Sequence, residues 1–66
     1  MTPASFKSWR KAARLSQAAA ARAIGISPRN VFAYEHGEKP IPLIVRLACA
    51  AYALGLRDYD GPLSGH

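Results

Sequence analysis

The sequence predicts an all-α domain of four compact helices, or five if the tail adds one. Half of the 66 residues are hydrophobic and 13 of these are alanine, the best helix former, whereas β-branched residues are few. Helix start and stop signals also recur along the chain at the spacing of short helices. Because a chain of this size buries only about 60% of its unfolded surface, we expect one core and one domain.

Capping residues delimit the first two helices. Thr2 is a good N-cap, and the proline after it fits the first position of a helix. This helix ends before Ser16, which we expect to cap a second, alanine-rich helix over residues 17–24. Gly25 then supplies the backbone freedom that a tight turn needs.

The same signals predict the rest of the domain. Ser27 and the proline after it start a third helix over about 28–36. Two prolines bracket a short connection to a fourth helix over about 41–55. The predicted domain therefore covers residues 1–56, and residues 57–66 form a short polar tail of turns and frayed chain.

The net charge of +5 is unevenly distributed. The first 34 residues contain six Lys or Arg and no acid, whereas the other 32 contain three basic and four acidic residues. A basic half of this kind favours a polyanionic partner, with a merely solubilising surface as the alternative.

Other classes of protein are disfavoured. One cysteine rules out a disulfide framework, and no Cys/His cluster has metal-ligand spacing, so we expect no cofactor and no metal. No apolar run approaches the roughly 18 residues of a membrane helix and no signal-peptide profile is present, which predicts a cytoplasmic protein. With four acids and no histidine placed beside a nucleophile, an enzyme is not expected.

Two short helices joined by a glycine-containing turn are typical of a DNA-reading helix-turn-helix. The second and third predicted helices carry residues at fixed spacing, followed by an aromatic-Glu-x-Gly-x-x-Pro ending: Gln17, Ala21, Ile24, Gly25, Ile26, Val31, Tyr34, Glu35, Gly37 and Pro40. Over about residues 5–55 the chain thus resembles the Cro/C1-type (XRE-like) helix-turn-helix repressors. This resemblance implies a lambda-repressor-like fold and a double-stranded DNA operator as partner. It also implies a structural pair between Arg10 and Glu35.

By the same resemblance, the start of the third helix enters the major groove. The expected base-reading residues are Pro28, Arg29, Asn30, Phe32 and Ala33. Arg29 is the first candidate, because its fork matches guanine O6 and N7. Asn30 either pairs with adenine or turns toward the backbone, and Phe32 either contacts thymine methyl groups or covers the edge of the core. Ala33 offers only a methyl contact to thymine.

Polar and basic residues around this helix are expected to bind phosphates. Gln17 lies at a helix N-terminus, where backbone N–H groups and the helix dipole favour an anion, and we expect it to bind phosphate together with Ser16. The remaining phosphate candidates are Ser27, His36, Lys39, Lys11, Arg14 and Arg22.

The fourth predicted helix carries two apolar stripes, more than three small helices can cover. We assign the first to the core: Leu43, Ile44, Leu47, Ala51 and Leu54. The second, extended by one residue, is expected to form a homodimer interface: Ile41, Val45, Ala48, Cys49, Tyr52 and Leu56. Alternatively the tail, with Leu56, Tyr59 and Leu63, folds back over this second stripe.

The predicted function is a dimeric repressor that binds an inverted-repeat operator in a phage, mobile-element or bacterial promoter, with autoregulation as an option. An antitoxin that binds both its own promoter and a toxin is the alternative. An adaptor that binds proteins but not DNA is a third interpretation, and a membrane-active peptide is disfavoured because no helix separates basic from apolar faces.

Overall fold

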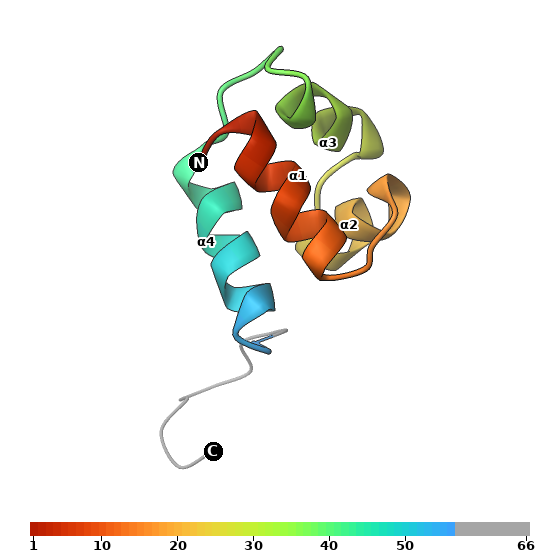
Figure 1. Ribbon diagram of the computed structural model, residues 1–66, viewed down its shortest axis with the longest axis vertical. Helices are drawn as coiled ribbons and strands as arrows, with labels where there is room; N and C mark the ends of the chain where they lie inside the picture. The colour runs from red at the N-terminus through yellow and green to blue at the C-terminus, as the bar shows by residue number, and fades with distance from the viewer. Residues whose placement is uncertain (57–66) are drawn as a thin grey trace.

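The computed structural model describes residues 1–56, which fold into four helices and contain no strand (Figure 1). The helices are α1 (Pro3–Ala12), α2 (Gln17–Ile24), α3 (Pro28–Glu35) and α4 (Leu43–Ala53). The prediction of an all-α domain is confirmed. α4 is shorter than the expected 41–55, because Pro42 is its extended N-cap and Gly55 takes a left-handed conformation after its last turn. The expected tail at 57–66 lies outside the described residues.

Hydroxyl caps start three of the helices, as the sequence predicts. Ser16 Oγ and Ser27 Oγ each accept a hydrogen bond, at 3.1 Å, from the amide three residues further along. At α1, the side chains of Thr2 and Ser5 accept hydrogen bonds from each other's backbone amides and form a capping box. Each cap satisfies N–H groups that helix geometry leaves without a partner.

Each helix of residues 1–56 is followed by a residue with positive φ. At the end of α2, Gly25 has φ 75°, and the next amide donates to the carbonyl oxygen five residues earlier (2.9 Å). Glycines 37 and 55 occupy the matching positions after α3 and α4. After α1 this position is held by Arg14, with φ 59°, a conformation that carries a steric cost for any residue with a Cβ.

The core is centred on Phe6 of α1, whose ring is fully buried. It packs against the rings of Trp9 and Tyr34, with centroids 5.4 and 5.8 Å away. Ala20 and Ala21 of α2 are both buried, and Ala21 belongs to the same core cluster as Val31 and Tyr34 of α3, where its small side chain allows the two helices to lie close together. All four helices contribute to the main core cluster, which consists of Phe6, Ala21, Val31, Tyr34, Val45 and Cys49.

The two apolar stripes of α4 have the opposite roles to those expected. Val45 and Cys49, assigned to a dimer interface, are buried in the core of the subunit, so the prediction was wrong for both. Ile41 packs on the same core, Ala48 is half-buried, and the Tyr52 ring meets Trp9 edge to face at 6.0 Å. Of the predicted interface only Leu56 is exposed.

The stripe assigned to the core is on the surface. Its four large side chains are between 57% and 78% exposed: Leu43, Ile44, Leu47 and Leu54. Both stripes are apolar and lie on nearly opposite faces of one helix, so periodicity alone does not decide which one packs inward. We call these four residues the α4 stripe.

Cys49 behaves as the small buried residue that the sequence predicts. Burial raises the pKa of its thiol to about 11, so the thiol is protonated at neutral pH. A buried, protonated thiol is a poor nucleophile and a poor metal ligand. Within residues 1–56, no cluster of His, Cys, Asp and Glu could hold a metal ion.

None of the helices in the described part of the chain has the length and apolar character needed to cross a membrane.

The conformation of Arg14 makes a prediction about stability. Arg14→Gly should stabilise the fold by about 1 kcal/mol, because relief of the left-handed strain exceeds the extra flexibility of glycine in the unfolded chain. This corresponds to a Tm increase of about 4–8 °C in thermal unfolding followed by circular dichroism. Arg14→Ala removes the same charge but keeps a Cβ, so it serves as the control and should not raise the Tm. Equal Tm values for the two variants would contradict strain at this position.

Candidate nucleic-acid interface

α2 and α3 form a compact pair whose second helix has one free face. Three residues join the two helices, and the last of them, Ser27, caps α3. Val31 and Tyr34 anchor α3 in the core, whereas Pro28 and Arg29 in its first turn are exposed. One face of α3 is therefore fixed against the core, and its first turn is exposed to solvent.

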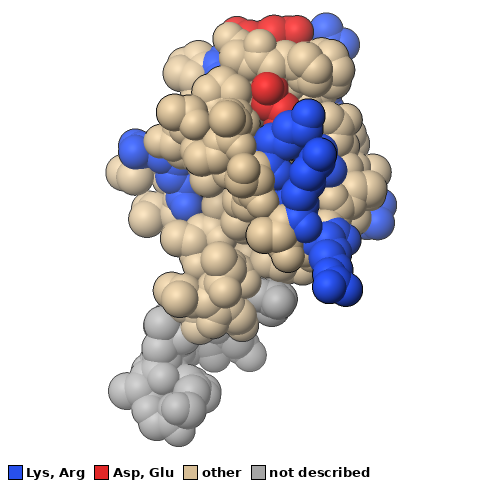
Figure 2. Space-filling model, viewed as in Figure 1, with Lys and Arg blue, Asp and Glu red and all other residues tan. Residues whose placement is uncertain are grey.

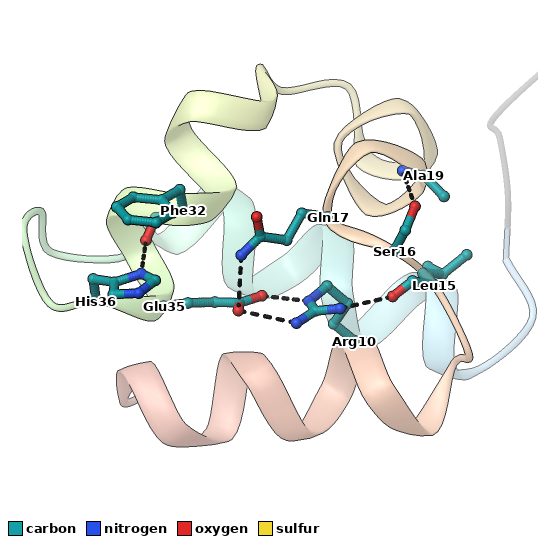
Figure 3. Close-up of polar contacts among 8 residues, drawn as sticks. All are labelled: Arg10, Leu15, Ser16, Gln17, Ala19, Phe32, Glu35 and His36. Atoms are coloured by element: carbon teal, nitrogen blue, oxygen red, sulfur yellow. Dashed lines mark hydrogen bonds and ion pairs between the residues drawn. The ribbon is translucent and has the colours of Figure 1, made fainter.

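A buried ion pair fixes the other end of α3 (Figure 3). Arg10 of α1 donates from Nε and Nη2 to Oε2 and Oε1 of Glu35, at 2.5 and 3.1 Å. The remaining guanidinium nitrogen, Nη1, donates to the carbonyl oxygen of Leu15 in the turn before α2 (2.9 Å). Gln17 Nε2 donates to Glu35 Oε1 at 3.3 Å. The expected pairing of Arg10 with Glu35 is thus present, and it links α1, the start of α2 and the end of α3.

Both members of this pair are held in their charged forms. The side chain of Glu35 is only 2% exposed, and this burial by itself would raise the pKa of the carboxyl group. Hydrogen bonds from Arg10 and Gln17, together with the Arg10 charge and a weaker contribution from Lys7, outweigh burial and lower the pKa of Glu35. In the same way, the hydrogen bond to Glu35 raises the pKa of Arg10.

The predicted base-reading residues do not share one environment. Arg29 is exposed and forms no ion pair within residues 1–56, and Phe32 is 43% exposed. Asn30 is half-buried, and its Oδ1 accepts a hydrogen bond from Lys39 Nζ at 3.0 Å. These two partners are nine positions apart in the chain, and the sequence predicts different roles for them.

Ala33 differs from the expectation. Its side chain is 3% exposed and lines a surface groove of about 460 Å³ that is also bordered by Arg29, Phe32, Glu38 and Lys39. A methyl group covered in this way presents almost no surface to a thymine. The predicted contact with Ala33 is therefore not available in this conformation.

Phe32 and His36 form a stacked pair on the outer face of α3, which is not among the contacts predicted from the sequence. Their ring centroids are 3.8 Å apart and their planes differ by 17° (Figure 3). His36 Nδ1 donates to the carbonyl oxygen of Phe32 at 2.8 Å, since a carbonyl oxygen only accepts. The four-residue spacing that places side chains on one helical face was the available signal.

Ser16, Gln17 and Ser27, three of the predicted phosphate-binding residues, already have structural contacts. The Ser16 and Ser27 hydroxyls accept amide hydrogen bonds as caps, which leaves their own O–H groups to donate. Gln17 uses its amide nitrogen for Glu35, so it acts as a second partner of the buried carboxylate. Its contact with phosphate stays a prediction.

The basic residues lie at the surface as expected. Lys11, Arg14, Arg22, His36 and Lys39 are all exposed. On the face shown in Figure 2, Lys and Arg side chains gather in a band alongside α1, on the side away from α4. A second basic group lies at the opposite edge of this view, over α4, and the band beside α1 is the larger of the two, which favours a polyanionic ligand there.

The fold and this surface together define a helix-turn-helix DNA-binding domain: two short helices in contact, the second with a capped, exposed first turn. A family profile described as helix-turn-helix matches residues 6–55, so the chain belongs to the Cro/C1-type helix-turn-helix family. This is a family of DNA-binding transcription regulators, not of enzymes. No curated protein and no solved structure matches the chain.

The buried pair makes a prediction about acid stability. The pKa of Glu35 is lower in the folded state than its unfolded value of about 4.3, so the carboxylate stabilises the fold above that pH. This stabilisation is lost as the pH falls through the folded-state pKa. We therefore expect urea unfolding to show a larger loss of stability from pH 7 to pH 3 in the wild type than in Glu35→Gln.

Two further variants complete this test. Glu38→Gln removes an exposed acid and should keep the wild-type pH dependence. Glu35→Ala leaves the Arg10 guanidinium without its partner and should cost about 3 kcal/mol at pH 7. If Glu35→Gln and the wild type lose equal stability on acidification, the carboxylate is not the source of the acid sensitivity.

Proposed function

We propose that the protein is a dimeric repressor that binds an inverted-repeat operator, with the first turn of α3 in the major groove. The observation that carries this proposal is Arg29, which is exposed and free of ion pairs within residues 1–56. Arg29 lies in a helix whose start is capped by Ser27 and whose last residue, Glu35, is paired with Arg10. A held helix with a free arginine in its first turn suits direct reading of guanine through O6 and N7.

Phosphate contacts would position the domain on the duplex. The exposed cations Lys11, Arg14, Arg22 and Lys39 supply charge, and the Ser16 and Ser27 hydroxyls supply hydrogen bonds at helix starts. With roughly 4–6 such contacts per subunit, log affinity should fall with log salt at a slope of about −4 to −5 per subunit.

The α4 stripe is the surface that we propose for the dimer, in place of the stripe expected from sequence. Four large aliphatic side chains on one face of a helix are more than half exposed, which is unusual for a small monomeric domain. A two-fold partner would cover the same residues on both subunits. The same dimer would present one copy of α3 to each of two operator half-sites, which lie about one turn of the DNA double helix apart, some 34 Å.

Repression follows from occupancy, because a dimer seated on a promoter excludes the transcription machinery. Targets of this kind are promoters of a phage, a mobile element or a bacterium, including the promoter of the repressor itself. The alternatives from the sequence, an antitoxin and a protein-binding adaptor, make different predictions in the two experiments below.

Selection of bound sequences from a random duplex pool tests the DNA-reading role. The wild type should enrich an inverted repeat with guanine in each half-site, and Arg29→Ala should lose about tenfold or more of its preference at that position. Arg22→Ala, which removes an equal charge from α2, should weaken binding to all sequences without changing the preference. An adaptor would enrich no sequence, and salt-independent binding would contradict phosphate contacts.

Sedimentation analysis tests the dimer. Leu47→Asp and Ile44→Asp place a charge in the proposed interface and should weaken association at least about tenfold, with loss of cooperative operator binding. Ala18→Asp adds the same charge at an exposed site on α2 and should leave association unchanged. A wild type that stays monomeric at all concentrations would contradict the homodimer and leave the α4 stripe for a different protein, as in an antitoxin.

A further inference from the structure

The hydrogen bond between Lys39 and Asn30 links the first turn of α3, which reads DNA in the proposed function, to the connection that follows the same helix. Asn30 lies in the first turn of α3, and Lys39 lies in the connection between α3 and α4. Lys39 Nζ donates to Asn30 Oδ1 at 3.0 Å. The backbone of Asn30 is held as well, because its amide donates to Ser27 Oγ at 3.1 Å.

This contact fixes which way the Asn30 amide group points. An ammonium group has three donors and no acceptor, so only the carbonyl oxygen of the amide can face it. The Nδ2 group therefore points away from Lys39. It is the part of the side chain that has no hydrogen bond to another residue within the described chain.

The orientation decides which base the side chain can pair with. Asparagine reads adenine with two hydrogen bonds: Nδ2 donates to N7, and Oδ1 accepts from the N6 amino group. Here Oδ1 already accepts from Lys39, and its second lone pair lies beside a full positive charge. A positively polarised amino group of adenine is disfavoured there, whereas the acceptors N7 and O6 of guanine are not.

We propose that Lys39 is a specificity-determining positioning residue that converts Asn30 from a reader of adenine into a hydrogen-bond donor that prefers guanine. The proposal rests on the proposed DNA-reading function of α3. Lys39 acts through Asn30 and through its own charge, without itself pairing with that base. With Arg29 next to Asn30 in the chain, the first turn of α3 then presents hydrogen-bond donors to DNA at two successive residues.

Selection from a random duplex pool with matched variants tests this role. Asn30→Ala identifies the operator position that Asn30 reads, because preference is lost there. At that position the wild type should prefer guanine, and Lys39→Met, which keeps a long side chain without the ammonium, should shift the ratio of adenine to guanine about tenfold toward adenine. Lys39→Arg keeps a cationic donor for Asn30 Oδ1, so this variant should keep the wild-type preference for guanine.

The controls separate specificity from affinity and from folding. Lys11→Met removes an exposed lysine from α1 and should weaken binding without changing the preference at any position. Circular dichroism should give all four variants the helical content and the cooperative unfolding of the wild type, since Lys39 is exposed and Asn30 lies outside the core cluster.

The outcomes are distinguishable. A wild type that selects no sequence overturns the proposed function, and the role of Lys39 with it. If the wild type selects an operator, three results overturn the role of Lys39 alone: no position loses preference in Asn30→Ala, that position prefers adenine in the wild type, or Lys39→Met leaves its preference unchanged.

Discussion

The buried carboxylate of Glu35 is the interaction on which the rest of the structure depends. A carboxylate that is 2% exposed destabilises a fold unless it is compensated, and Arg10 and Gln17 provide three hydrogen bonds to it. Because these donors come from α1 and from the start of α2, the end of α3 keeps one position relative to both. Through the Leu15 carbonyl, the same guanidinium also holds the turn between α1 and α2.

α3 owes its helical state to its surroundings. Eight residues are too few for a stable isolated helix in water. Ser27 caps its start, Val31 and Tyr34 bury one face, and Glu35 ties down its end. Phe32 and His36 stack on the opposite face, so even its exposed rings are restrained. Since these restraints exist before a ligand arrives, binding would require little further ordering of the helix.

What the sequence predicts well is local, and what it misses depends on packing. Hydroxyl caps and terminal glycines lie within a few residues of the helices they delimit, so the helix positions followed directly. The Arg10–Glu35 pair was expected only through family resemblance. The orientation of α4 did not follow, because its two faces are similarly apolar and the space left by the other helices selects between them. The contact between Asn30 and Lys39 depends on the path of the α3–α4 connection, for which the chain carries no periodic signal.

The arrangement of α4 has an evolutionary consequence. Val45 and Cys49 point into the core, while Leu43, Ile44 and Leu47 point away from it, so one short helix presents two separate chemical faces. Substitutions on the inner face are constrained by folding. Side chains on the outer face are exposed and lie outside the core cluster, so folding constrains them less, and under the proposed function they would determine what the domain associates with. The surface proposed to read DNA belongs to a different helix, so under the proposed function a lineage could change its partner and its operator in independent steps.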